Sequence, residues 1–376
     1  MVSAAPKKFR VLVVDDSAFM CKVLETIFNA DEQLNVVGHA KDGREAIALS
    51  ESLKPDVITM DLNMPHMDGL QATAHIMTNS PRPIVVVSSE SKEGASSTLK
   101  ALELGAIDFV TKPSGGIDLD MQSVKEELLR KVRVAAKVRV VRTASRLASA
   151  VQAPSKSSRV PDTGSKPARP VPSASSDLRF PVVVLAASTG GPATVMRLAP
   201  GFTRDFPAAV FLVQHMPASF TTQYALQLAE FTGIRVKEAE ANETVQPGTL
   251  YICPGGQHLR VSPTGRIELD ATTGRIDGYL PNIDVTMDSV AAYAGAMSIG
   301  VVLTGMGSDG ARGARAIKTA GGLVLAQDEA TSVIFGMPAE TIKAGVVDQV
   351  LSIDDIYAAI EKRVLGLCRA LPVGVR

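Results

Sequence analysis

The sequence predicts an α/β protein with two doubly wound, mostly parallel sheets joined by a linker. From Phe9 to about residue 131, short apolar runs alternate with helical patterns, and a second alternation begins at Phe180. Between them the composition turns to Ser, Pro, Ala, Lys and Arg. Strands that alternate with helices favour parallel sheets with helices on both faces. We therefore expect domains at 1–131 and 180–376, and a flexible basic linker at 132–179 that tethers them.

The composition excludes several classes of protein. Lys+Arg and Asp+Glu both total 39, so no net charge attracts nucleic acid, and the basic linker lacks interleaved aromatic residues for base stacking. No apolar run approaches the ~20 residues of a membrane span, and the N-terminus lacks a signal-peptide core. The 3 cysteines are far apart, as in a reduced compartment. We expect a cytoplasmic protein without membrane insertion or nucleic-acid partner, and a monomer as the default.

The first domain is expected to be flavodoxin-like. Its predicted strands are Val11 to Val14, Val36 to Gly38, Val57 to Met60, Ile84 to Val87 and Phe109 to Thr111. In the strand order 2-1-3-4-5, the residues that follow strands 1, 3, 4 and 5 meet at the carboxyl edge of the sheet.

Charged side chains, most of them acidic, follow these predicted strands. Asp15 and Asp16 come after the first strand, Asp61 after the third and Lys112 after the fifth. Three carboxylates at one edge repel one another unless a cation joins them, and Mg²⁺ prefers such oxygen ligands. The metal and Lys112 would neutralise charge on a phosphoryl group transferred to a carboxylate. Taken singly, an Asp-Asp pair after a strand is also typical of a turn or helix cap.

Together, the motifs of the first domain resemble those of two-component receiver domains. They are Val13-Val14-Asp15-Asp16-Ser17, Met60-Asp61-Leu62-Asn63-Met64-Pro65, Met67-Asp68-Gly69, Val87-Ser88-Ser89 and the run from Gly105 to Pro113. The resemblance implies that Asp61 is the phosphoacceptor, and that Asp15, Asp16, Asp61 and the Asn63 carbonyl hold Mg²⁺. It also implies that Ser88 and Phe109 form the switch pair, that Lys112 contacts the phosphoryl group, and that a histidine kinase is the phosphodonor.

The second domain shows the same alternation of elements. Strands are predicted near 181–187, 208–215, 249–253, 299–304 and 322–326, and helices near 192–199, 217–230, 284–296, 310–320 and 353–366. Residues 258–270 alternate around a Pro-Thr-Gly turn, which predicts an antiparallel hairpin attached to the parallel core.

Candidate catalytic residues follow three of these strands. An apolar run ends on Ser188 before two glycines and a proline suited to a helix start, another ends on His215, and a third leads into a glycine-rich loop with Asp309. At the carboxyl edge of a parallel sheet they can converge as nucleophile, base and orienting acid. Alternatives stay open. The serine turn also suits phosphate, His215 suits a buried core position with His258 as the other candidate base, and Asp309 suits a cap of the helix that follows.

The whole chain resembles the chemotaxis protein-glutamate methylesterase (CheB) family. The motifs are Ala187-Ser188-Thr189-Gly190-Gly191-Pro192, Gln214-His215-Met216-Pro217, the run from Cys253 to His258, the run from Leu303 to Gly310, Ala326-Gln327-Asp328-Glu329 and Phe335-Gly336-Met337-Pro338. The resemblance implies hydrolysis of γ-glutamyl methyl esters, and deamidation of glutamines, on cytoplasmic helices of chemoreceptors. It assigns Ser188 as nucleophile, His215 as base then acid and Asp309 as the orienting group, with Thr189 and the Met306 N–H as supports and no esterase cofactor.

Two residues depart from the family pattern. Ala186 replaces a glycine often found two residues before the serine, and Asn282 stands where the family usually has serine. These changes bear on substrate preference more than on the chemistry.

The family also implies that the receiver packs over the esterase crevice and that phosphorylation of Asp61 loosens the packing. The competing hypotheses are a non-enzymatic response regulator with a protein-binding second domain, and a hydrolase of small soluble esters.

Overall fold

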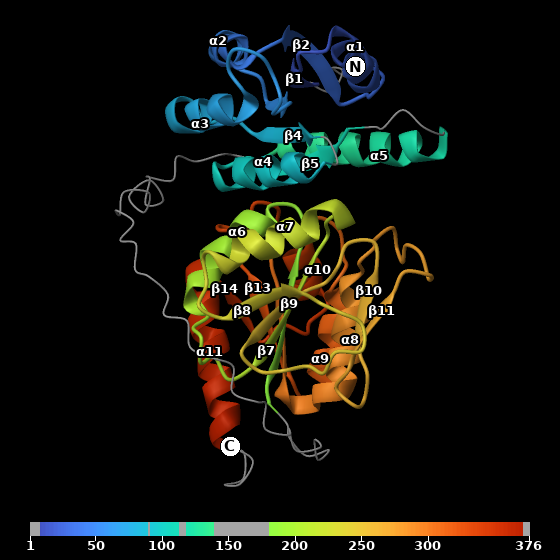
Figure 1. The fold of residues 1–376 in the computed structure, drawn as a ribbon, viewed down its shortest axis with the longest axis vertical. Coiled ribbons are helices and arrows are strands. Elements are labelled where there is room, and N and C mark those ends of the chain that lie inside the picture. Colours follow the sequence, from blue (N-terminus) through green and yellow to red (C-terminus); the bar gives the residue numbers. More distant parts are fainter. Residues whose placement is uncertain (1–7, 89–90, 113–117, 139–179, 371–376) are drawn as a thin grey trace, which may run out of the picture.

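The chain folds into two α/β domains stacked end to end (Figure 1). The computed structural model describes residues 8–88, 91–112, 118–138 and 180–370. Most of the expected linker, from residue 139 to 179, lies outside the described residues, as do Ser89 and Pro113. Among the described residues, no helix is both long and apolar enough to span a bilayer.

The first domain contains a five-stranded parallel sheet in the order β2-β1-β3-β4-β5, which confirms the flavodoxin-like prediction. Its strands are β1 (Phe9–Val14), β2 (Leu34–Ala40), β3 (Val57–Met60), β4 (Ile84–Ser88) and β5 (Asp108–Thr111). Its helices are α1 (Ala18–Asn29), α2 (Gly43–Leu53), α3 (Gly69–Asn79), α4 (Lys92–Glu103) and α5 (Asp118–Ala135). The central strands β3 and β4 are almost wholly apolar and fully buried, because both faces of the sheet are covered.

Local signals explain where these helices begin and end. Side chains of Ser17, Asp42, Asp68 and Ser91 cap the first four helices by accepting hydrogen bonds from their first-turn N–H groups. Helix α5 continues past residue 131 to Ala135, because Val132 and Ala135 are buried in the core of the first domain. The end of the receiver domain is therefore helical for some residues beyond the expected boundary.

The second domain contains a seven-stranded, fully parallel sheet in the order β14-β13-β12-β6-β7-β9-β8. Its strands are β6 (Val182–Ala187), β7 (Ala209–Gln214), β8 (Arg235–Glu238), β9 (Thr249–Ile252), β12 (Ser298–Val302), β13 (Leu323–Gln327) and β14 (Gln349–Leu351). Strand β6 lies between β7 and β12. The strands that directly follow β6 in the sequence are added on one side of it, and β12, β13 and β14 are added on the other side. Ligand sites of doubly wound sheets lie at such a switch point.

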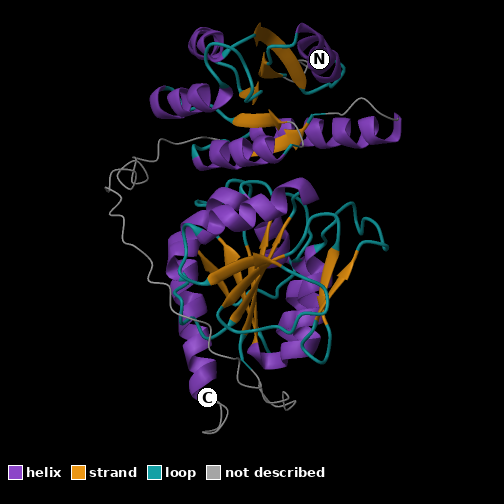
Figure 2. Cartoon of the chain, in the orientation of Figure 1, coloured by secondary structure: helices purple, strands orange, loops and turns teal. Residues whose placement is uncertain are grey.

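Helices cover both faces of this sheet (Figure 2). They are α6 (Gly191–Leu198), α7 (Ala218–Ala229), α8 (Ile283–Ala294), α9 (Ala311–Thr319), α10 (Met337–Lys343) and α11 (Ile353–Ala370), with short 3₁₀ turns at Ala199–Gly201 and Gly295–Met297. The predicted hairpin is present as β10 (His258–Val261) and β11 (Ile267–Asp270), and it forms a two-stranded sheet of its own. Three further elements, β8, β14 and α10, carry no clear sequence pattern, since β8 is largely polar and the other two are short.

The two domains contact each other through α4 and β5 of the first and α6 and α7 of the second (Figure 1). Phe109 of β5 packs on Phe220 of α7 with ring centroids 4.3 Å apart. The side chains of Glu103 and Gln227 form a hydrogen bond across the same boundary. One cluster of buried apolar side chains runs through both domains and includes Phe109 and Phe220. The receiver is therefore packed against the carboxyl edge of the second sheet.

Candidate active site and receiver site

Ser188 directly follows β6 and is fixed by its own backbone. Its N–H donates to the Thr304 carbonyl at 3.0 Å, and its carbonyl accepts from Gln214 Nε2 at 2.9 Å. Gly305 passes so close that a Cβ at that position would lie 2.8 Å from the Ser188 Cβ. Glycine is therefore required at 305 to let the loop after β12 approach the serine.

The three predicted catalytic side chains meet at this edge. His215 follows β7, and its Nδ1 lies 3.0 Å from Ser188 Oγ. Its Nε2 lies 2.8 Å from Asp309 Oδ2, and Asp309 is in the loop between β12 and α9. All three are largely buried, which strengthens their hydrogen bonds relative to water. The arrangement has the geometry of a nucleophile, a base and a group that orients the base.

The contacts of Asp309 fix the tautomer of His215. An ionised carboxylate only accepts hydrogen bonds, so the proton of a neutral His215 must be on Nε2. Nδ1 is then unprotonated and faces the Ser188 hydroxyl, as a base requires. The two ring nitrogens have the opposite roles to those in chymotrypsin-type triads, where Nε2 faces the serine.

Asp309 caps a helix, but not the one that the sequence analysis considered. It accepts hydrogen bonds from the N–H groups of Ile283 at 2.8 Å and Asp284 at 3.0 Å, at the start of α8. The start of α9 is bonded to Asp284 instead, whose Oδ1 accepts from Gly310 and Gly313. Burial raises the pKa of Asp284 despite these hydrogen bonds. The two carboxylates thus tie α8 to the loop that carries Asp309.

Met306 and Thr189 lie beside the serine in different settings. The Met306 N–H has no acceptor among the described residues, whereas the Ser188 N–H is already bonded to Thr304. The Thr189 hydroxyl donates to Asp108 Oδ2 in the receiver at 2.6 Å. Of the two residues predicted to support catalysis, Met306 has a backbone N–H without an acceptor among the described residues. The Thr189 side chain is hydrogen-bonded to the receiver domain.

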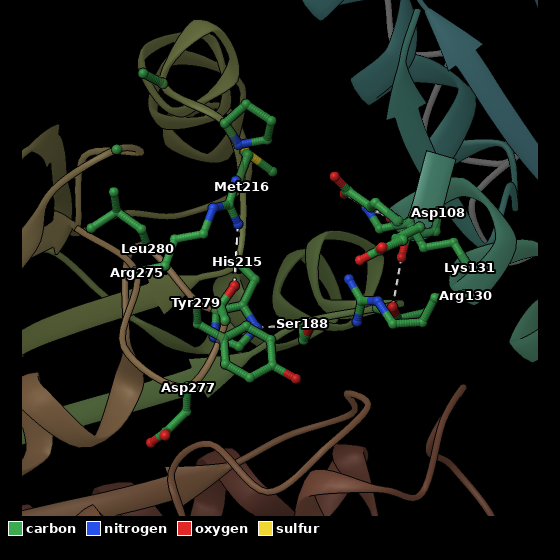
Figure 3. Close-up of a pocket in the computed structure, with 17 residues that line it drawn as sticks. Asp108, Arg130, Lys131, Ser188, His215, Met216, Arg275, Asp277, Tyr279 and Leu280 are labelled. Carbon is green, nitrogen blue, oxygen red and sulfur yellow. Dashed lines mark hydrogen bonds and ion pairs between the residues drawn. The ribbon is translucent and has the colours of Figure 1, made fainter. Parts of the chain in front are cut away.

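A cavity of about 550 Å³ lies over Ser188 and His215 and is lined by both domains (Figure 3). The receiver supplies Asp108 and several residues of α5, including Arg130 and Lys131. Lys131 Nζ lies 3.1 Å from Asp108 Oδ1 and donates to the Phe109 carbonyl at 2.7 Å. Burial would lower the pKa of Lys131, but its ion pairs with Asp108 and Glu127 outweigh that effect and raise it. The receiver therefore closes one side of the cavity with a charged, hydrogen-bonded wall.

His258 is excluded as the base by its contacts. It is fully buried, donates from Nε2 to the Gly274 carbonyl at 2.7 Å, and accepts at Nδ1 from the Asn282 N–H at 3.2 Å. The Asn282 side chain in turn caps α8 by accepting from the Val285 N–H at 3.1 Å. Serine and asparagine are both good N-caps, so this departure from the family pattern keeps the same structural task.

The predicted acidic cluster also assembles in the receiver. Carboxylate oxygens of Asp15, Asp16 and Asp61 lie within 4.8 Å of one another. Lys112 Nζ lies 2.8 Å from an oxygen of Asp15 and 2.8 Å from one of Asp61. Burial raises the pKa of Asp61, and the hydrogen bond from Lys112 offsets this only in part. Burial alone would lower the pKa of Lys112, but the two carboxylates raise it.

The predicted switch pair lies between this cluster and the second domain. Ser88 ends β4, and its hydroxyl donates to the Gly94 carbonyl at 3.3 Å. The Phe109 ring packs on Phe220 of the second domain. The Asn63 N–H lies 3.3 Å from Asp61 Oδ1, which places the Asn63 backbone next to the cluster.

Sequence reasoning missed three residues that the structure places at these sites. Tyr279 stacks on His215, Asp284 anchors the loop of Asp309, and Asp108 accepts the Thr189 hydroxyl. Only Asp108 carried a signal, since it precedes the switch residue Phe109. Tyr279 and Asp284 follow no predicted strand.

Comparisons with known proteins agree with the two-domain organisation. The family model "CheB methylesterase" matches residues 183–360, and the response regulator receiver domain model matches residues 11–123. A protein-glutamate methylesterase/protein-glutamine glutaminase of Nitratidesulfovibrio vulgaris is 44% identical over 93% of this chain and 98% of its own length. The Pyrococcus horikoshii protein of that name is 43% identical over 95% and 94%.

One of the solved structures that resemble this chain is that of a single domain. The crystal structure of the Thermotoga maritima CheB methylesterase catalytic domain is 39% identical, with a TM-score of 0.47, and covers 49% of this chain and 98% of that chain. The relatives' identity and coverage extend over both domains. The chain therefore belongs to the family of protein-glutamate methylesterase/protein-glutamine glutaminases, in which a receiver domain precedes a CheB methylesterase domain.

Proposed function

We propose that this chain removes methyl groups from glutamate esters, and deamidates glutamines, on the cytoplasmic helices of chemoreceptors, under the control of a histidine kinase. The observation that carries the proposal is the hydrogen-bonded chain from Ser188 through His215 to Asp309 at the switch point of the sheet. The names and coverage of the relatives support the substrate class.

The hydrolytic steps follow from this geometry. Ser188 Oγ attacks the ester carbonyl carbon while its proton passes to His215 Nδ1, and Asp309 stabilises the resulting imidazolium. The Met306 N–H is the donor available to the oxyanion. Collapse of the tetrahedral intermediate releases methanol, which takes the proton from His215. Water then attacks the acyl-enzyme by the same route and frees Ser188; a glutamine side chain releases ammonia instead.

The receiver restrains the esterase by covering its cavity. Asp108 and α5 close one side of the cavity and so hinder the approach of a receptor helix to Ser188. We expect phosphorylation of Asp61 to loosen the packing of the receiver on the esterase, which includes the contact of Phe109 with Phe220. A tenfold change in activity needs only about 1.4 kcal/mol of differential interaction between the closed and open arrangements.

Mg²⁺ is expected to bind the receiver cluster and support phosphorylation. Asp15, Asp16, Asp61 and the Asn63 carbonyl would hold the ion, because clustered carboxylate oxygens suit a hard divalent cation. The bound ion would neutralise charge on the phosphoryl oxygens together with Lys112.

Added Mg²⁺ should raise the melting midpoint of the receiver. At a Mg²⁺ concentration of 100 times the dissociation constant, the free energy of unfolding should increase by about 2.7 kcal/mol. Because the pKa of Asp61 is raised, protons compete with the metal as the pH falls, and the stabilisation should shrink in acid. Calorimetry of the full chain at neutral and acidic pH measures this effect. An equal Mg²⁺ shift in an Asp61→Ala, Asp16→Ala variant would show that the ion binds elsewhere.

Replacing Asp61 by alanine should leave basal esterase activity intact and abolish its stimulation by a phosphodonor. The residue is in the other domain from Ser188, and its loss removes the group that accepts the phosphoryl. Methanol release from methylated receptor, measured with and without acetyl phosphate, provides the test. Equal stimulation of the variant and the wild type would refute this control mechanism.

A further inference from the structure

We infer that Tyr279 is a positioning residue for the esterase, because it holds both the general base and the loop that supplies the oxyanion donor. The inference rests on the proposed function, since it gives a further residue of the same site a task. Figure 3 shows the Tyr279 ring against His215 among the residues that line the cavity.

The backbone around Tyr279 is built to deliver its side chain to one place. Ile276 and Tyr279 exchange two backbone hydrogen bonds, of 3.0 and 2.9 Å, across a tight turn. The two residues inside the turn, Asp277 and Gly278, have φ values of 51° and 86°, as in a type I′ turn. The Asn282 side chain bonds the Ile276 carbonyl at 3.3 Å and so ties the turn to the start of α8.

The ring of Tyr279 supports the imidazole of His215 from one face. The ring centroids are 4.2 Å apart, and the planes are within 13° of parallel. His215 is otherwise held by hydrogen bonds at its two ring nitrogens, to Ser188 and to Asp309. These two bonds do not stop the imidazole from rotating about the axis that joins its two nitrogens. Only packing against the face of the ring restrains that rotation. A flat π face against the ring limits that rotation, and it also attracts the ring when it becomes a cation during catalysis.

The hydroxyl of Tyr279 reaches the other half of the site. It donates to the Met306 carbonyl at 3.3 Å, in the residue whose N–H is free for the oxyanion. Burial raises the pKa of Tyr279, so its hydroxyl stays a donor. The next residue, Gly307, has a φ of 91°, and a Cβ there would lie 2.5 Å from the Tyr279 hydroxyl. One side chain therefore sets the plane of the base and the path of the oxyanion loop.

The test uses the full chain, activated by acetyl phosphate and Mg²⁺, with methylated receptor as substrate. Tyr279→Phe keeps the stacked ring and should stay within about threefold of wild-type kcat, whereas Tyr279→Leu loses the ring and should lose about tenfold in kcat with KM within about twofold. Tyr279→Met is a second non-aromatic variant if the leucine protein does not fold, and melting midpoints verify folding. The inference would be overturned if the leucine and methionine variants had the same kcat as the phenylalanine variant, or if only their KM changed.

A second comparison isolates the hydroxyl. Gly307→Ala places a methyl group against the Tyr279 oxygen, and the next ring atom is 3.6 Å away. Gly307→Ala should therefore reduce kcat at least about threefold more in the wild-type background than in the Tyr279→Phe background. Equal losses in both backgrounds would contradict the contact. A wild-type chain that releases no methanol at all would instead refute the proposed function.

Discussion

Replacing Asp309 by asparagine is expected to lower kcat for ester hydrolysis about 10⁴-fold, as the equivalent change does in a serine protease. The carboxylate accepts from His215 Nε2 at 2.8 Å and thereby keeps the proton on that nitrogen. An amide NH₂ directed at Nε2 would favour the other tautomer, with the proton on Nδ1, where it faces Ser188. The base would then be occupied by a proton before the reaction starts. The rate of methanol release from methylated receptor at saturating substrate gives kcat.

Asp284→Asn is the matched control for this variant. Asp284 is buried and accepts hydrogen bonds from Gly310, next to Asp309, and from Gly313 in α9, but no described contact joins its side chain to His215. We expect this control to lower the melting midpoint, with kcat of the folded protein within a few-fold of wild type. If both variants lose the same activity, Asp309 acts only by holding the loop in place.

Ser188→Ala is expected to reduce methanol release to the background rate, a loss of about 10⁶-fold by analogy with removal of a triad serine. Within the described part of the chain, the Ser188 hydroxyl is hydrogen-bonded to His215 alone, so its removal should leave the fold and the receiver contacts in place. The variant should still accept a phosphoryl group at Asp61 from acetyl phosphate, and should still bind methylated receptor.

The same variant separates the competing functions. A response regulator whose second domain only binds a partner would keep all of its function without Ser188. A hydrolase of small esters would lose activity with Ser188→Ala, but the wild type would cleave soluble esters and leave receptor helices untouched. Persistent demethylation of receptor by the alanine protein would remove Ser188 from the mechanism.

Much of the fold can be read from the sequence because buried parallel strands leave unbroken apolar runs, such as Val182 to Ala187. Ser188 and His215 could be placed at one edge for the same reason, since each directly follows such a run. The order of β12, β6 and β7 then makes them neighbours of the loop with Asp309. Strand β8 could not be predicted, because its four residues are mainly charged and pair only with β9 at the edge of the sheet.

The residues that link separate parts of the site leave no local pattern. Asp108 and Thr189 are in different domains, and their hydrogen bond depends on how two finished folds pack. Tyr279 reaches His215 from a turn whose neighbours in sequence bear no apolar period. Asp309 looked like a cap of α9, whereas the structure assigns that task to Asp284 and uses Asp309 on α8. Such cross-connections require the positions of several elements at once.

We expect phosphorylation of the receiver to uncover a serine esterase that acts on methylated chemoreceptors. The most direct measurement is the rate of methanol release from methylated receptor by the full chain, with and without acetyl phosphate and Mg²⁺. We predict slow release that increases at least about tenfold when the phosphodonor is added. No release under either condition, or a rate that the phosphodonor leaves unchanged, would contradict the account.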